Sequence, residues 1–159
     1  PIRLAVLMTR QAISPRLAIR IFLNMHTPQS IGSLLDPRGL DNNSTKDEAE
    51  GRQVFSLPAT GDLVRKGGPG GGVVCGQALA AAADTVSVLA LAMINGAMRP
   101  NTTTDFSIRF LRPIAEGTVR IEVKPLSNGR RLAVTEVFFF AEGSEKPGAH
   151  ATCTFAWLD

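Results

Sequence analysis

One acidic residue in this chain stands in the middle of an otherwise apolar stretch. Asp84 lies within residues 78–94, where the only other polar side chains are the hydroxyls of Thr85 and Ser87. Burying an unpaired carboxylate is costly or shifts its pKa, and the cost is tolerated mostly where the group has a chemical role. A carboxylate in such a place can act as a nucleophile or as a general base. Asp84 is therefore the first candidate catalytic residue.

A glycine-rich run just before this stretch offers a second chemical group. Residues 66–72 read KGGPGGG, and we expect a helix over residues 75–95 that ends at Asn95-Gly96. The first turn of a helix presents free backbone N–H groups and the positive end of the helix dipole. Gly76, without a side chain, lets a carbonyl approach its N–H closely. One such oxyanion donor is typically worth roughly 10²–10³ in rate.

The spacing of Gly76 and Asp84 predicts an assembly. Asp84 follows Gly76 by eight residues, which is about 12 Å along a helix at ~1.5 Å per residue. An aspartate side chain is too short to bridge that distance, so one helix can hardly supply both groups to one carbonyl. Two antiparallel helices related by a two-fold axis would place Gly76 of one opposite Asp84 of the other. We therefore expect a homodimer.

The segments around the helix are typical of strands. Residues 51–58 read as one strand, and residues 102–111 and 118–126 alternate apolar and polar side chains with period two. In the first of these two, the alternation places Thr104 on the same face as Phe106. The order of elements, with one apolar helix to be covered, predicts an α+β fold in which an antiparallel sheet curls around a central helix.

The end of the chain predicts a hairpin and a last strand. Asn128-Gly129 is a strong hairpin signal, and it leads into residues 131–141. Within them, the run from Val134 to Phe140 is apolar on both faces except at Thr135 and Glu136. A strand of this kind suggests that its outer side meets another subunit. A further strand is expected over residues 149–158.

The first 50 residues differ from the rest. We predict that residues 1–50 are an N-terminal extension of helix and loop, followed by a single domain over residues 51–159. Ser14-Pro15 is a typical helix start and opens the apolar run RLAIRIFLNMH, whereas residues 27–50 are rich in turn-forming residues. The short apolar run at the N-terminus lacks a cleavage site and does not indicate a secretory signal.

Composition excludes several classes of function. The 159 residues carry 17 basic and 14 acidic side chains spread along the chain, which is no nucleic-acid signature. Cys75 and Cys153 lie far apart without metal-ligand spacing, which favours a reducing, cytoplasmic location without a disulfide. Residues 73–94 are long enough to span a bilayer, but Gln77, Asp84 and the strand-rich sequence that follows favour a core helix.

With these elements in order, the chain resembles the hot-dog fold, and within it the PaaI-type acyl-CoA thioesterases. Their signature is H-G-G, followed after a gap of six residues by an acid in an (L/A)-A-D-(T/S) context. Residues 75–77 (CGQ) occupy the first position and residues 83–85 (ADT) the second. DFSIRFLRP at 105–113, GRRLAV at 129–134 and the last strand complete the match, which covers residues 50–158. The family histidine is a cysteine here, and the second glycine is a glutamine.

The resemblance implies that the protein hydrolyses an acyl-CoA or aryl-CoA thioester to the free acid and CoA. Asp84 would be the nucleophile or general base, the Gly76 amide would polarise the carbonyl, and Thr103 would help position water. The family forms homodimers with sites at the interface, and we expect a dimer of dimers, a homotetramer. The resemblance implies no cofactor, no metal, no nucleic acid and no membrane partner.

Four further residues are expected to bind the substrate: Cys75, Gln77, Arg130 and Arg131. The two arginines would lie near the phosphates of CoA. Because Cys75 and Gln77 replace the usual residues, the alternative is a non-catalytic acyl-thioester binding protein on the same fold. A cysteine at a helix start is also a candidate nucleophile, although a small buried thiol is the more common role.

Overall fold

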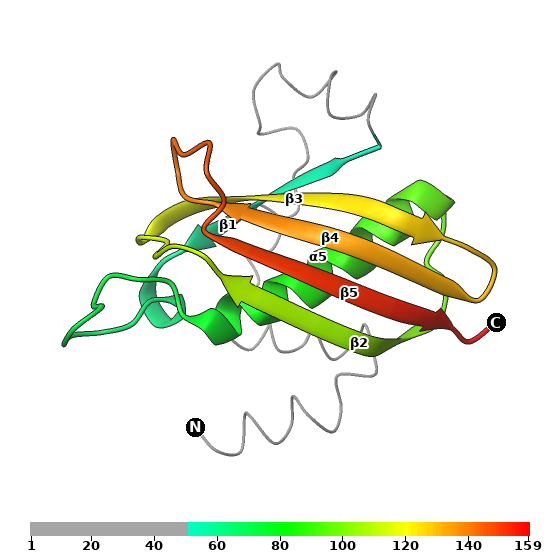
Figure 1. Cartoon of the computed structure of the whole chain (residues 1–159), viewed down its shortest axis with the longest axis horizontal. Helices are drawn as coiled ribbons and strands as arrows, with labels where there is room; N and C mark the ends of the chain where they lie inside the picture. The colour runs from blue at the N-terminus through cyan, green and yellow to red at the C-terminus, as the bar shows by residue number, and fades with distance from the viewer. Residues whose placement is uncertain (1–50) are drawn as a thin grey trace.

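The computed structural model describes residues 51–159, and the predicted extension over residues 1–50 lies outside the described residues. In chain order the elements are β1 (Gln53–Ala59), η1 (Gly61–Leu63), α5 (Gly76–Asn95), β2 (Asn101–Phe110), β3 (Gly117–Asn128), β4 (Leu132–Phe140) and β5 (Ala149–Trp157). Figure 1 shows one sheet curving along a single long helix. The predicted α+β hot-dog architecture is confirmed.

The five strands form one antiparallel sheet in the order β1-β3-β4-β5-β2. Strands β3, β4 and β5 are consecutive neighbours, whereas β1 and β2 form the two edges. The loop after β2 crosses to β3 on the far side of the sheet. This order places β1 and β2 on opposite sides of α5.

Helix α5 is the core of the domain. It begins directly after the glycine run and ends at Gly96, whose φ of 66° is a left-handed conformation that glycine adopts without strain. Ala82, Ala83 and Leu91 are buried, and the helix contacts all five strands. Length and composition alone would allow α5 to cross a membrane, but its packing against the sheet makes it the core helix of the domain.

Two details of the strands differ from the sequence expectation. A β-bulge between Thr103 and Asp105 shifts the register of β2 against β5. Because an extra residue reverses the alternation, Thr103 faces α5 together with Phe106, whereas Thr104 is exposed. The prediction that Thr104 shares a face with Phe106 is wrong.

The β3–β4 hairpin is present, but its turn lies two residues later than the Asn-Gly signal. The Gly129 amide donates to the Leu132 carbonyl at 2.9 Å, which leaves Arg130 and Arg131 at the tip. The φ of Gly129 is not positive, unlike that of nine other glycines, so Asn128-Gly129 is not the centre of the turn.

One polar contact crosses the buried layer between helix and sheet. The Thr135 hydroxyl on β4 donates to the Ser87 hydroxyl on α5 at 2.8 Å, and both side chains are fully buried. Burial raises the pKa of the neighbouring Cys153 thiol to about 11, so this cysteine is an inert, protonated core residue.

Candidate active site

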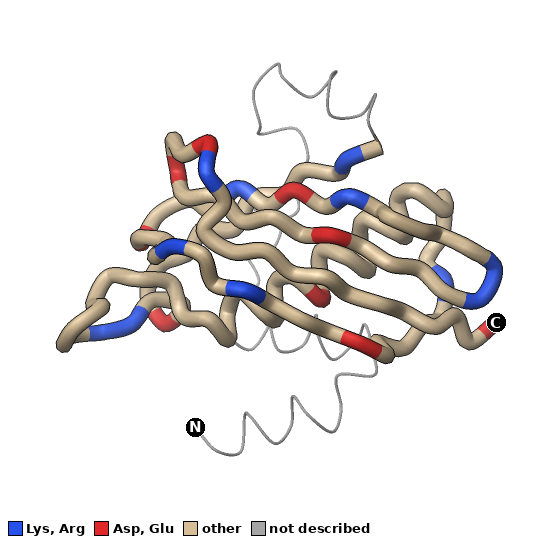
Figure 2. The backbone as a smooth tube through the Cα atoms, viewed as in Figure 1, with Lys and Arg blue, Asp and Glu red and all other residues tan. Residues whose placement is uncertain are grey.

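Asp84 and Thr103 meet between α5 and the edge strand β2. The Thr103 hydroxyl donates to Asp84 Oδ1 at 2.8 Å, and both side chains are partly buried. The bulge in β2 is what turns Thr103 toward the helix. Asp84 is the one charged residue of α5, whereas Figure 2 shows Lys, Arg, Asp and Glu residues dispersed over the strands and loops. The structure thus joins two predicted site residues from separate elements.

The surroundings of Asp84 change its acidity. Burial raises the pKa of the Asp84 carboxyl above its usual range, and the hydrogen bond from Thr103 opposes this with a smaller lowering effect. Within residues 51–159, no donor bonds the second carboxylate oxygen, Oδ2. A carboxylate of raised pKa with one oxygen held and one open is suited to accept a proton or to attack an electrophile.

The start of α5 presents the second group of predicted residues. Cys75 is the N-cap, and its carbonyl accepts from the amides of Ala78 and Leu79 at 3.0 and 3.2 Å. The amides of Gly76 and Gln77 precede these donors and have no intrahelical acceptor. The Cys75 side chain makes no capping bond. Two neighbouring N–H groups are thereby free to face a ligand oxygen.

Phe110 contacts the first residue of α5, and the sequence did not predict this contact. A Cβ atom built on Gly76 would lie 2.9 Å from Phe110 Cζ, so the ring at the end of β2 packs directly over the glycine. Gly76 is therefore small for two reasons, namely access to its amide and contact with this ring. The signal available in the sequence, a glycine followed later by a strand-ending phenylalanine, does not specify that the two meet.

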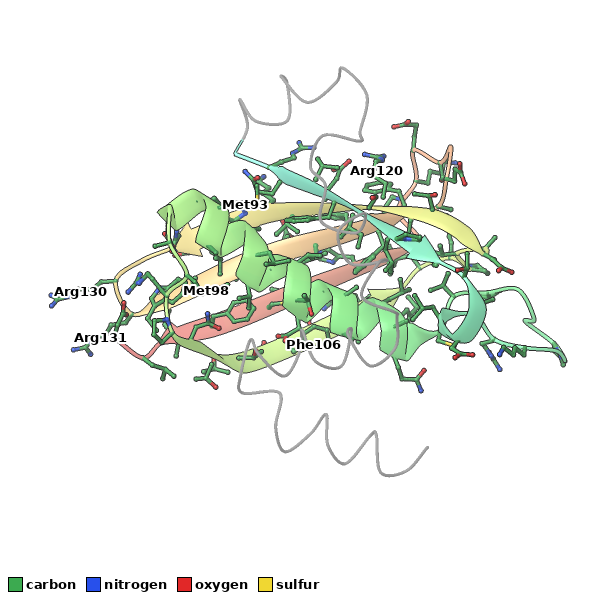
Figure 3. The ribbon with its side chains drawn as sticks, turned by 180° about the vertical axis from the view of Figure 1, so that it is seen from behind. Met93, Met98, Phe106, Arg120, Arg130 and Arg131 are labelled. Carbon is green, nitrogen blue, oxygen red and sulfur yellow. The ribbon has the colours of Figure 1, made fainter. Side chains whose placement is uncertain are left out.

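The two arginines lie far from the start of α5 within one protomer. Arg130 and Arg131 lie at the hairpin tip, at the end of the molecule where Asn128 bonds Asn95 at the C-terminal end of α5, and their side chains project away from Met93 and Met98 (Figure 3). The structure therefore does not bring them together with Gly76 inside a single chain.

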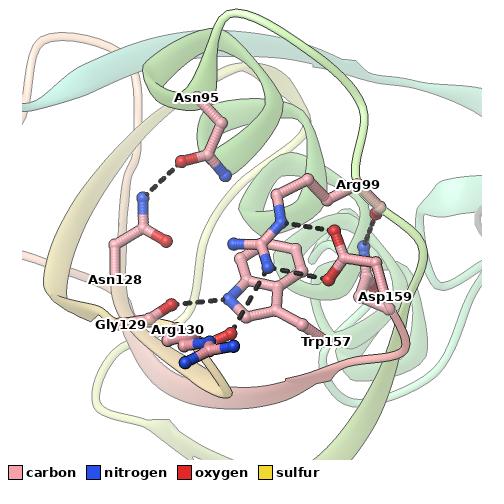
Figure 4. Close-up of polar contacts among 8 residues, drawn as sticks. Asn95, Arg99, Asn128, Gly129, Arg130, Trp157 and Asp159 are labelled. Carbon is pink, nitrogen blue, oxygen red and sulfur yellow. Dashed lines mark hydrogen bonds and ion pairs between the residues drawn. The ribbon is translucent and has the colours of Figure 1, made fainter.

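The base of this hairpin is held by a compact set of contacts, shown in Figure 4. The Arg99 guanidinium lies 4.2 Å from the centre of the Trp157 ring and pairs with the Asp159 carboxylate at 2.7 Å. The Trp157 indole N–H donates to the Gly129 carbonyl at 3.0 Å, and Arg99 also donates to the Arg130 carbonyl at 3.3 Å. These bonds fix the backbone of the tip and leave the side chains of Arg130 and Arg131 directed outward.

No metal centre is evident in the part of the chain that the structure describes. Residues 51–159 hold no group of three or more His, Cys, Asp or Glu side chains placed to bind a metal ion.

Comparison with known proteins identifies the family. A family model described as the thioesterase superfamily matches residues 71–147, a range that contains Gly76, Asp84 and Thr103. No curated protein sequence matches the chain significantly.

Solved structures agree with this match. A conserved protein of Pseudomonas aeruginosa is 30% identical, with a TM-score of 0.61, over 84% of this chain and 96% of its own. A candidate thioesterase of Silicibacter sp. is 31% identical, with a TM-score of 0.58, over 68% of this chain and 73% of its own. A Streptococcus mutans protein bound to acetyl-CoA shares the fold at 19% identity and a TM-score of 0.58, over 69% of this chain and 82% of its own. By the family match and these two relatives of 30% identity or more, the chain belongs to the thioesterase superfamily and has its hot-dog fold.

Proposed function

We propose that this protein is a PaaI-type thioesterase that hydrolyses an acyl-CoA or aryl-CoA thioester to the free acid and CoA. The observation that carries the proposal is the Asp84 carboxylate, partly buried on α5 with Thr103 bound to its Oδ1 at 2.8 Å. Membership of the thioesterase superfamily supports thioester hydrolysis in general. Asp84 and the amides at the start of α5 would supply the two groups that this reaction needs.

In the general-base route, Asp84 Oδ2 takes a proton from water while the water oxygen bonds to the thioester carbonyl carbon. The Gly76 and Gln77 amides donate to the oxyanion that forms. Collapse of the tetrahedral intermediate breaks the C–S bond, and the proton held by Asp84 passes to the leaving sulfur. We propose this route, to which a carboxyl of raised pKa is suited because it is a stronger proton acceptor.

A single turnover in ¹⁸O-labelled water tests for direct attack by Asp84. Direct attack by Asp84 forms a mixed anhydride, and water then opens it at either carbonyl; attack on the enzyme carbonyl leaves ¹⁸O in the aspartate. The general-base route puts the label only in the released acid. Label in the peptide that contains Asp84 would overturn the general-base assignment.

We place the complete site at a two-fold interface, with Asp84 of one protomer facing Gly76 of its partner. The support is the distance of about 12 Å between the two residues along one helix, together with the edge of β2 beside Asp84, which pairs with no further strand among residues 51–159. A dimer made through this edge would continue the sheet and set two α5 helices antiparallel.

Mixing two inactive variants tests this interface. Gly76→Val and Asp84→Asn each remove one half of the site, so each homodimer is expected to be inactive. After the two are refolded or co-expressed together, half of the dimers are mixed, and each mixed dimer holds one intact site out of two. About a quarter of the wild-type activity should return. If both residues of a site came from one chain, no activity would return.

The proposed substrate carries CoA. Arg130 and Arg131, at the outward tip of the hairpin, would contact its phosphates from a neighbouring protomer, while Cys75 and Gln77 would lie beside the thioester. A fold relative bound to acetyl-CoA supports a CoA ligand. We propose a cytoplasmic location, which the free thiols of Cys75 and Cys153 support, because disulfide bonds are rare in that compartment.

A thiol-release assay over a panel of acyl-CoA and aryl-CoA thioesters tests the proposed function. Wild-type protein should release CoA from at least one member, and Asp84→Asn should lower kcat by at least ~10³ with dimer and fold intact. Asp105→Asn, which changes an exposed aspartate on β2, is the matched control and should retain activity. Tight binding of the panel without any thiol release would instead favour the non-catalytic binding protein.

A further inference from the structure

An apolar groove lies beside the C-terminal end of α5, away from the candidate active site. It has a volume of about 390 Å³ and is lined by Phe55 on β1, Leu89, Ala92 and Met93 on α5, and Met98 in the following loop. We call it the helix-end groove. Met93 and Met98 are each 50% exposed, and Figure 3 shows both at this end of the helix.

The proposed dimer does not cover this groove. Phe55 belongs to β1, whereas Thr103 belongs to β2, and these strands are the two opposite edges of the sheet. A partner that pairs with β2 would lie on the Asp84 side of α5. An open groove lined by methionine, leucine and phenylalanine side chains needs another occupant, because exposed apolar patches of this kind usually mark a contact.

The first described strand, β1, starts beside the groove. Strand β1 starts at Gln53, and Phe55 in the groove wall is only two residues further on. The residues that precede Gly51 are therefore joined to the domain at this end of the molecule. Residues 27–52, at up to ~3.3 Å per residue, can span much more than the length of α5, so an earlier segment can fold back and reach the groove.

One segment of the first 50 residues has the right sequence for it. Residues 16–26, RLAIRIFLNMH, place Arg16, Arg20 and Asn24 four residues apart, on one stripe of a helix, and the other side chains except the terminal His26 are apolar. Such a helix cannot remain in water with its wide apolar face uncovered. We propose that residues 16–26 dock as an amphipathic helix in the helix-end groove of the same chain.

Hydrogen exchange on the full-length protein tests the docking. The peptide that covers residues 16–26 should exchange at least about tenfold more slowly than unprotected chain. The double variant Met93→Lys/Met98→Lys should return it to the unprotected rate while peptides of β3, β4 and β5 keep their protection. Leu111→Lys is the matched control, since Leu111 is 49% exposed at the other end of α5, and it should leave residues 16–26 protected. Fast exchange in the wild type, or unchanged protection in the double variant, would overturn the proposal.

A cross-linking experiment separates docking within one chain from docking between two copies. Phe22→Cys and Met98→Cys are combined in a Cys75→Ser background, where the remaining native thiol, Cys153, is buried. A short bis-maleimide should join positions 22 and 98 within a single chain. Joined pairs of chains would assign the groove to a second copy, and the absence of any link would exclude this segment as the occupant.

Discussion

At the scale of the residue, the bond between Thr103 and Asp84 predicts a pH effect. The Thr103 hydroxyl stabilises the ionised carboxylate and lowers its pKa against the larger raising effect of burial. Thr103→Val removes the donor, so the pKa of Asp84 should rise further. The acidic limb of the kcat/KM profile should then move to higher pH, because a base must be deprotonated to act. We also expect kcat/KM to fall about tenfold, the effect of losing one hydrogen bond to a charged group.

Thr104→Val is the matched control for this measurement. It changes the same residue type one position away, but Thr104 is exposed and donates to the Thr154 carbonyl. Its pH profile should coincide with that of the wild type. An acidic limb that stays in place in Thr103→Val would separate Thr103 from the chemistry of Asp84.

The same carboxylate predicts an opposition between activity and stability. A raised pKa means that the folded protein holds the proton more tightly than the unfolded chain, whose value is near 3.8. Stability from this group therefore falls as pH rises from the unfolded value through the folded one, and at neutral pH the full cost of the buried charge is present. Asp84→Asn should raise the free energy of unfolding at pH 7 by roughly 0.5–2 kcal/mol, the usual range of stabilising substitutions.

Thermal or urea unfolding at two pH values checks this. The difference between Asp84→Asn and the wild type should be largest at neutral pH and should shrink on acidification, once the wild-type carboxyl is protonated. A variant less stable than the wild type at pH 7 would show that the carboxylate has a stabilising partner.

At the scale of the element, the contact between the start of α5 and the end of β2 allows two roles of Gly76 to be distinguished. One role is packing against the Phe110 ring, and the other is to leave the backbone amide accessible to the substrate. In Gly76→Ala the new methyl group would meet the Phe110 ring, at a cost of about 1 kcal/mol, because Phe110 is 58% exposed and its ring can shift. Gly76→Ala/Phe110→Leu should recover the stability. Turnover should stay low in both variants, since the methyl group also obstructs the amide. Recovery of turnover together with stability would mean that Gly76 serves packing alone.

Much of the element layout was predictable from the sequence. The alternation of residues 102–111 and 118–126, the apolar helix, and the glycines at its two ends report local geometry, and each led to the observed element within a residue or two. Asp84 was identifiable because burying a lone carboxylate in an apolar helix is costly and is tolerated mostly where the group has a chemical role. Thr103 was named as a site residue from family resemblance, whereas simple alternation placed Thr104, and not Thr103, on the face of Phe106.

What could not be predicted depends on contacts between distant segments. The bulge in β2 is set by pairing with β5, and the turn at Arg130 and Arg131 by the ladder between β3 and β4. The packing of Phe110 on Gly76 and the helix-end groove arise only when strands and helix are assembled. Such features have no local signature.

At the scale of the whole molecule, the free edge of β2 predicts that stability and activity in solution depend on protein concentration. Its outer edge presents a row of backbone N–H and C=O groups without a partner strand among residues 51–159, and an unprotected edge of this length is a template for uncontrolled strand addition. If a second protomer occupies the edge, folding and assembly become linked, and the melting temperature should climb as protein concentration is raised from nanomolar to micromolar. Dilute samples should lose activity as the protomers dissociate, and activity should return when the protein is concentrated again. A melting temperature independent of concentration would show that the lone protomer protects this edge by itself.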